Sequence, residues 1–345
     1  MLLALELSLK EKIEKQYEEW MACCPNKKRE IDAWIKSADE DEAVCMKYLY
    51  AYMHPCDIVS YDVEVIASYV KATLDMYANV PYVKQVPAEL FFTYVLCVRV
   101  NNEDLDKSRE WIYRQLVDRV KDKKTMVEAA LEVNYWCYEK ATYIPSDDRT
   151  LAPFGMCNSA RGRCGEESTL AVSAMRSVGI PARQCYVPRW AHCDDNHAWV
   201  ELWCDGKWYF TGACEPLMIL NKGWFTNASS RAMMVHSRLF DLFPAEGEDV
   251  IGKEGAAVML NQTARYAKVK KVTVKVADRA GAPVKEAQVQ FQVLNMGEYY
   301  PIAKAKTDEN GTVSLVTGLG SVRVAAFRPD MEGFAQADVD TREQV

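Results

Sequence analysis

The sequence predicts an α+β protein in which a helical region, a mixed region and an all-β region follow one another. Apolar residues recur at three- and four-residue steps from Leu9 to about Tyr143. A helix and three strands are predicted next, and strict alternation of apolar and polar residues follows beyond residue 264. We therefore expect the division to be helices in 1–130, a central core in 131–240, a linker in 241–263 and a small β-sandwich in 264–345.

The helical region is divided by prolines. Pro55, Pro81 and Pro87 fall between the periodic segments, where a missing backbone N–H and a fixed φ interrupt helices. No repeat of fixed period is visible. These residues are expected to form a helical layer on the core.

The central region contains one short helix, EESTLAVSAMRSVG, which should end at Gly179 and Pro181. Three predicted strands follow it: ARQCYVPRW, HAWVELW and KWYFTGA. The last two are joined by Asp205-Gly206, a dipeptide that favours tight hairpin turns. This region is thus a helix followed by a small sheet.

The C-terminal region alternates over VKKVTVKV, AQVQFQVL and SVRVAAF, with turn sequences between them. An acidic, Gly-rich stretch precedes it and is the predicted linker. The ending DVDTREQV leaves little room for a final strand. We expect either an incomplete sandwich or a native chain that continues beyond residue 345.

Charge and composition exclude several functions. The 345 residues include 42 Lys and Arg against 49 Asp and Glu, a net charge of −7. A general nucleic-acid binder needs a basic face instead. No apolar run approaches the roughly 20 residues of a membrane span, and no secretory signal is recognisable. We expect a cytoplasmic protein, or a secreted or periplasmic one if the native N-terminus is missing.

Cysteine and histidine usage argues against a metal site. The twelve cysteines include no CxxC pair. His192, Cys193, Asp194 and Asp195 are contiguous, a spacing that does not suit tetrahedral zinc. No Gly-rich phosphate loop is present, so we expect neither a metal nor an organic cofactor. His54 and His236 are expected to be structural.

One cysteine stands out. The stretch RGRCGEES places Cys164 between Gly162 and Gly165 at the start of the predicted helix. The positive end of a helix dipole stabilises a thiolate, and free N–H groups there can bind an oxyanion. The flanking glycines would let a substrate carbonyl approach the sulfur. Cys164 is therefore the candidate nucleophile.

A thiol nucleophile needs a base that can also protonate a leaving amine, and histidine suits both tasks. His197 begins the strand HAWVELW. Glu215, just past KWYFTGA, is the nearest acid to orient the imidazole. Asn158, six residues before Cys164, is a candidate oxyanion donor or a plain loop or capping residue.

A combination of features occurs in this order: GRCGEES, a helix, GIPAR, NHAWVEL and a tryptophan-bearing strand. On this combination, roughly residues 130–235 resemble the transglutaminase-like superfamily. The resemblance implies a papain-like fold, with Cys164 as nucleophile and His197 as base. Bacterial members and peptide N-glycanases look most similar. Arg183 in GIPAR is expected to pair with an acid in the strand layer.

The third catalytic position departs from the family pattern. The family usually has Asp-Pro soon after the tryptophan strand, but direct alignment puts Gly212 at the Asp position, and the acid-proline pair is Glu215-Pro216. Glu215 could replace the aspartate from a shifted backbone. Otherwise the third position is vacant, or is filled by Asp194, Asp195 or Asn196.

The resemblance implies cysteine-dependent acyl transfer on amide bonds of a protein or peptide through a thioester, with hydrolysis favoured over cross-linking. Two alternatives remain open. One is a peptide N-glycanase-like amidase, which the missing CxxC pairs disfavour. The other is a catalytically silent binding scaffold, suggested by the absent acid at position 212. The oligomeric state is not predicted.

Overall fold

The computed structural model describes residues 3, 5–145, 149–239, 247–254, 257–330 and 333–342. These residues form two compact units. The first comprises Met1–Gln184, Trp199–Gly223 and Leu239–Pro244; the second comprises Cys185–Ala198, Trp224–Arg238 and Ala245–Val345. The mixed helix and sheet content confirms the predicted α+β class. The four-segment division made from sequence stays a prediction.

The first unit begins with the predicted helices. Pro55 and Pro81 each begin a helix, and Pro87 directly precedes one, because proline suits the first turn of a helix. The elements are α1 (Leu7–Met21), α2 (Pro25–Ile35), α3 (Glu40–Tyr52), α4 (Pro55–Ser60), α5 (Val63–Asn79), η1 (Pro81–Gln85), α6 (Ala88–Phe91), η2 (Phe92–Leu96), α7 (Ser108–Val120) and α8 (Met126–Lys140).

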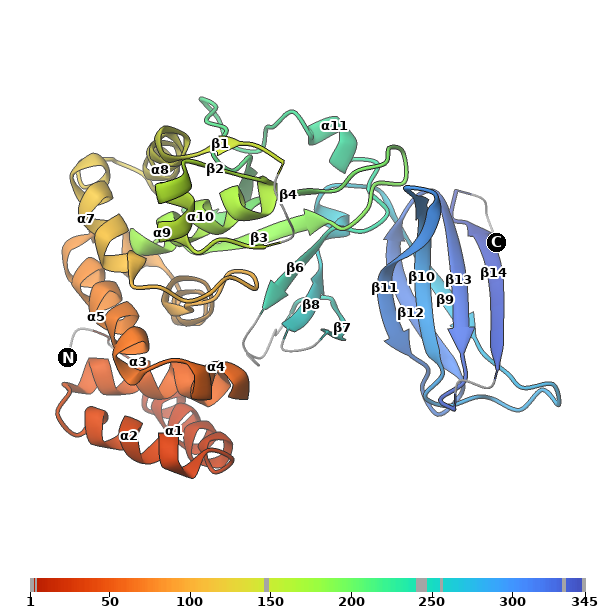
Figure 1. The fold of residues 1–345 in the computed structure, drawn as a ribbon, viewed down its shortest axis with the longest axis horizontal. Coiled ribbons are helices and arrows are strands. Elements are labelled where there is room, and N and C mark those ends of the chain that lie inside the picture. Colours follow the sequence, from red (N-terminus) through yellow and green to blue (C-terminus); the bar gives the residue numbers. More distant parts are fainter. Residues whose placement is uncertain are drawn as a thin grey trace. The chain divides into compact units, whose positions relative to one another are not determined.

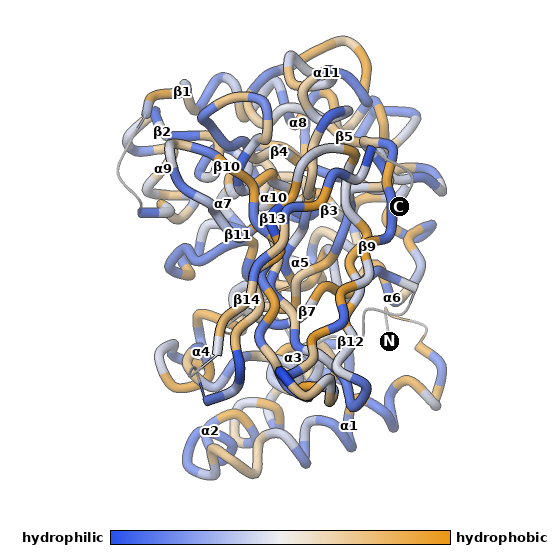
Figure 2. Tube along the Cα trace, turned by 90° about the vertical axis from the view of Figure 1, so that its right-hand side faces the viewer, coloured by the Kyte–Doolittle hydropathy of each residue, from blue (hydrophilic) through white to orange (hydrophobic). Residues whose placement is uncertain are grey.

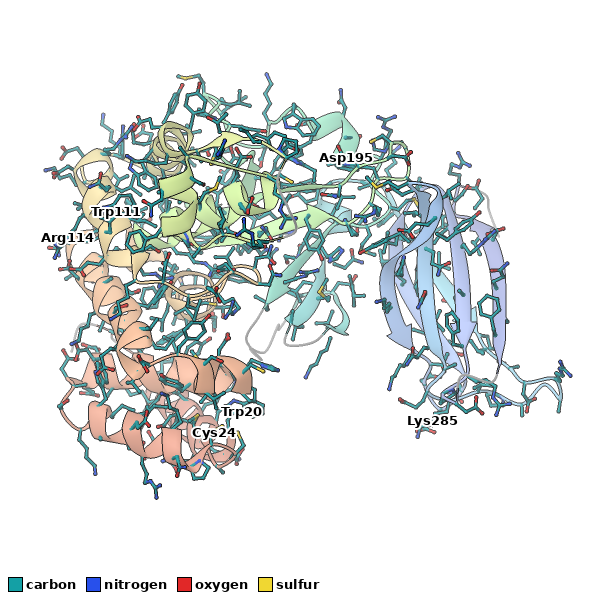
Figure 3. All side chains as sticks on the ribbon, in the orientation of Figure 1. Trp20, Cys24, Trp111, Arg114, Asp195 and Lys285 are labelled. Atoms are coloured by element: carbon teal, nitrogen blue, oxygen red, sulfur yellow. The ribbon has the colours of Figure 1, made fainter. Side chains whose placement is uncertain are left out.

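The central helix of this unit is α10 (Cys164–Ser177), which packs against α7, α8 and α9 (Pro153–Ser159) (Figure 1). Trp111 of α7, labelled in Figure 3, contacts the rings of Trp136 and Phe154. Two short parallel strands, β1 (Thr142–Tyr143) and β2 (Arg161–Gly162), lead into α10. Most of α10 is buried, so its start is held in a defined place.

The predicted strands are present. β4 (His197–Cys204) and β5 (Lys207–Thr211) pair antiparallel, and Asp205 and Gly206 form the turn with positive φ angles. In the first unit the strand order is β5-β4-β3, where β3 spans Ala182–Val187. In the second unit the order continues from β3 through β6 (His236–Leu239), β8 (Ala257–Asn261) and β7 (Val250–Glu254).

The predicted linker contains structure. β7 and β8 form an antiparallel hairpin inside 241–263, while residues 240–246 and 255–256 lie outside the described part. The Gly-rich, acidic composition of this stretch predicts a linker, and neither strand was expected from it. α11 (Thr226–Ser229) and η3 (Thr263–Arg265) complete this part of the unit.

The second unit ends in two antiparallel sheets, ordered β11-β10-β13-β14 and β12-β9. Apolar and polar residues alternate along these strands (Figure 2), and the inward set, including Phe291, forms a separate core. A strand does form near the C-terminus. The strands are β9 (Val269–Lys275), β10 (Gln288–Asn295), β11 (Glu298–Lys306), β12 (Thr312–Gly318), β13 (Ser321–Phe327) and β14 (Phe334–Asp340).

Arg183 pairs with a strand acid, as expected. Its Nε donates to Glu201 Oε2 at 2.8 Å, and both side chains are almost fully buried. The guanidinium also lies over the ring of Trp208, 4.4 Å from its centroid. Such a pair fixes the register of β3 against β4 at a site where neither charge can reach water.

We predict that Glu201→Ala lowers the free energy of unfolding by about 3–5 kcal/mol, because it leaves the Arg183 charge buried without its carboxylate. The control is Glu110→Ala, which removes an exposed ion pair with Arg114 on α7 and should cost about 0–1 kcal/mol. Urea denaturation of both variants checks this. Equal losses would contradict it.

Candidate active site

Cys164 is the first residue of α10 and is half-buried. The start of the helix is fixed by Glu166, which is 1% exposed. Its carboxylate accepts the N–H of Arg163 at 2.8 Å and the N–H of Leu151 at 3.3 Å. The first N–H groups of a helix have no partner within it, so this end can stabilise negative charge. Cys164 therefore lies at a helix end that can stabilise the negative charge of a thiolate.

Gly162 and Gly165, which flank Cys164, lie in different surroundings. A Cβ at Gly162 would lie 2.6 Å from Met156 Sδ and 2.9 Å from Glu166 Oε2, so glycine is required there by packing within the protein. A Cβ at Gly165 would meet no atom within 4 Å. Only the space beside Gly165 is open, as approach of a substrate carbonyl requires. For Gly162, internal packing accounts for the residue instead.

The first turn of α10 is also tied to β3. Gln184 Nε2 donates to the carbonyl oxygen of Gly165 at 2.9 Å and to Ser168 Oγ at 2.7 Å. Ser168 Oγ in turn donates to the carbonyl oxygen of Cys164 at 2.6 Å. Asn101 holds the other end of Gln184, with its Nδ2 2.9 Å from Gln184 Oε1. The backbone around Cys164 is thus rigidly positioned.

Glu215 occupies the space of a side chain at position 212. A Cβ on Gly212 would overlap Glu215 Oε2. The carboxylate from residue 215 therefore folds back over the position where the family places its aspartate. This geometry is what a shifted backbone with a longer side chain would produce.

Asn134 of α8 holds this turn and was not anticipated from the sequence. Its Nδ2 donates to the carbonyl oxygen of Gly212 at 2.9 Å, and its Oδ1 accepts the N–H of Cys214 at 3.0 Å. Cys214 has a positive φ of 56°, which is uncommon for a residue with a side chain. The buried amide of Asn134 therefore stabilises the strained turn that Glu215 follows. The only sequence signal was a polar residue on the apolar face of AALEVNYWC.

Glu167 is a second unanticipated acid. Its side chain is 4% exposed. Burial, with the nearby charges of Glu215 and Glu166, raises the pKa of Glu167 to about 8. At neutral pH it is therefore protonated, and one fewer negative charge surrounds Glu215.

His197, the first residue of β4, lies in the second unit and is 7% exposed. The rings of Trp224 and Phe225 lie with centroids 4.6 Å and 4.9 Å from the imidazole. Burial lowers the pKa of His197 to about 4. The imidazole is therefore neutral at pH 7, the form that can accept a proton.

The other candidates are placed differently. Asp194 Oδ1 accepts the N–H of Met296 at 2.7 Å, and Asp195 Oδ1 accepts the N–H of Asn196 at 2.7 Å. Asp195, labelled in Figure 3, and its neighbours lie on an exposed loop. Asn158 lies exposed in the last turn of α9, away from any N-cap position.

His192 is also exposed, with its ring 5.3 Å from that of Trp190. In the described ranges, no three His, Cys, Asp or Glu side chains are arranged to hold a metal ion. Across the same ranges, every helix is too short or too polar to cross a lipid bilayer.

Comparison with known proteins bears on these residues. Residues 114–213 match the transglutaminase-like superfamily. The expected resemblance to that superfamily is confirmed over this segment. The segment includes Cys164 and His197 and ends two residues before Glu215. No curated protein matches the chain.

Two solved structures are similar. One is a candidate cysteine protease from Cytophaga hutchinsonii, with 15% identity and a TM-score of 0.27, covering 61% of this chain and 66% of that one. The other is red sea bream transglutaminase, with 11% identity and a TM-score of 0.28. The match covers 89% of this chain and 64% of that one. The chain thus spans just under two thirds of each. Similarity this low carries no inference about activity.

We predict that the contribution of Glu167 to the free energy of unfolding falls as pH rises from about 4.5 to about 8, and that up to about pH 6.5 the buried His197 and His236, whose pKa values are lowered, contribute the opposite slope. In this window folded Glu167 keeps a proton that the unfolded chain, with the ordinary pKa of 4.5, has lost. Glu167→Gln should flatten this slope, whereas exposed Glu89→Gln should not. Denaturant titrations at several pH values measure it. An unchanged slope in Glu167→Gln would show that the carboxyl titrates normally.

Proposed function

We propose that the protein is a cysteine-dependent enzyme that cleaves amide bonds in polypeptides through a thioester. The observation that carries this proposal is the placement of Cys164 at the fixed, half-buried start of α10, beside the open space at Gly165. A structural cysteine needs neither feature. The superfamily match over residues 114–213 supports it.

In the proposed reaction, Cys164 Sγ attacks the amide carbonyl and forms the C–S bond. The thiol proton passes to the imidazole of His197 and then to the leaving amine as the C–N bond breaks. Water then attacks the thioester, gives a proton to the imidazole and releases the acid, and the thiol is restored. Backbone N–H groups at the start of α10 are proposed to stabilise the oxyanion, with Asn158 as the side-chain candidate.

Glu215 is proposed to orient His197 and stabilise its imidazolium. A buried histidine whose pKa is about 4 needs a carboxylate to accept a proton readily. Asp194 is engaged with the N–H of Met296 in the β10–β11 hairpin, and Asp195 with the N–H of Asn196 on its own loop. The carboxylate of Glu215 instead replaces a side chain at position 212.

Exposed apolar side chains around the first-unit site support a polypeptide substrate. Tyr143 pairs with Gly162 across β1 and β2 and is 55% exposed, and Met218 beyond Glu215 is 79% exposed. Hydrolysis is preferred over cross-linking in this proposal, because exposed surroundings give water access to a thioester.

We predict that Cys164 is alkylated by iodoacetamide faster than the exposed thiol of Cys23 below pH 7, and that His197→Ala removes this advantage. Peptide mass spectrometry measures both thiols in one digest. His54→Ala, at the half-buried N-cap of α4, is the control and should leave the ratio unchanged. If Cys164 is inert, or reacts like Cys23 in the wild type, the protein is a binding scaffold rather than an enzyme.

Gly212→Ala tests the third position. The added methyl group would displace the Glu215 carboxylate, and we predict an alkylation rate at Cys164 at least tenfold lower, since misplacement by about 1 Å can cost about 10²-fold. Gly155→Ala in α9 is the control: its Cβ would lie at an ordinary contact distance of 3.6 Å from Leu151, so the rate should be retained. Normal reactivity in both Gly212→Ala and Glu215→Gln would exclude Glu215 from the site.

A further inference from the structure

The second unit contains a cavity of about 600 Å³ that the proposed reaction does not use. Its walls come from the loop at Ala191 and His192, from Arg231, from the β10–β11 hairpin and from β13 with the turn before it. All of these residues belong to the second unit. The cavity can therefore be considered within that unit alone.

The cavity is basic in a protein whose net charge is −7. Three arginines line it, Arg231, Arg323 and Arg342, against the single acid Asp338. Arg323 pairs with Asp338, and Arg342 pairs with Asp340. Within the described part of the chain no carboxylate pairs with Arg231, which is exposed. One guanidinium is thus available to a ligand.

Apolar side chains lie beside this charge. Leu294 is 57% exposed and Leu319 is 40% exposed, and both line the cavity. The ring of Tyr299 is covered by Arg323, 3.5 Å from its centroid. A ligand that fits this lining presents both an anion and apolar groups.

We propose that this cavity binds an acidic segment of a polypeptide, with a carboxylate paired to Arg231 and an apolar side chain against Leu294 and Leu319. Arginine recognises carboxylates through two parallel hydrogen bonds. A free phosphate would leave both leucines in water. A nucleic acid would be repelled by the acidic remainder of the protein.

The cavity shares a wall with the loop that leads to His197. Asn295 Nδ2 donates to the carbonyl oxygens of Trp190 and Cys193, at 2.8 Å each. Met296 N–H binds Asp194, so the β10–β11 hairpin holds this loop in place. If the proposed function holds, on which this step rests, the bound segment belongs to the substrate.

The test uses the full chain carrying Cys164→Ala, so that nothing is turned over. Fluorescence anisotropy with a labelled peptide of alternating Glu and Leu should give saturable binding, and a Gln-Leu peptide should bind at least tenfold more weakly. Arg231→Gln should weaken Glu-Leu binding by about tenfold. Arg279→Gln, an exposed arginine outside the cavity, should not. Thermal melts verify that both variants fold.

Equal affinity for the two peptides, or binding unaffected by Arg231→Gln, would overturn the inference. Inorganic phosphate that displaces the peptide at equal concentration would reduce the site to an anion site and also overturn it. If the peptide does not bind but Cys164 is reactive, the inference about the cavity is wrong and the proposed function is unaffected. If the peptide binds but Cys164 is inert, the proposed function is wrong and the peptide-binding cavity is supported.

Discussion

The carboxylate of Glu166 is the constraint on which the rest of the first unit depends. It is buried at the start of α10 and accepts two backbone N–H groups, from Arg163 and Leu151. By doing so it fixes the start of the helix at Cys164 and, together with Met156, leaves no room for a side chain at Gly162. The half-buried Cys164 therefore lies at the end of a helix whose body is core.

In the proposed reaction, Glu215 would supply the third position from a different backbone position than the family uses. The position of the family's aspartate is a glycine, and the carboxylate comes from three residues later. Asn134 makes this possible because it binds both sides of the turn and holds Cys214 at positive φ. The neighbouring Glu167 keeps its proton at neutral pH, which limits repulsion around Glu215.

The second unit contributes more than a separate sandwich. Its β10–β11 hairpin anchors the loop that carries Asp194 and leads to His197. The same hairpin borders the basic cavity. One element thus supports both a candidate catalytic residue and a candidate recognition site.

The sequence by itself determined the local features: the helices begun by proline, the Asp205-Gly206 hairpin, the helix that starts at Cys164, and the pairing of Arg183 with a strand acid. These rest on periodicity and turn chemistry within a few residues. It did not reveal the β7–β8 hairpin or the strands β11, β12 and β14. Pro301 interrupts the pattern of β11, and β14 is a largely exposed edge strand.

The contacts that hold the turn carrying Glu215 form only in the tertiary structure. Asn134 lies 78 residues from Gly212, and Glu167 is 48 residues from Glu215 along the chain. No local pattern can report such contacts, because they exist only when α8, α10 and the turn after β5 pack together. For the same reason the sequence could not identify Arg231 as a candidate binding residue, because the cavity beside it forms only when β13 and the β10–β11 hairpin pack together.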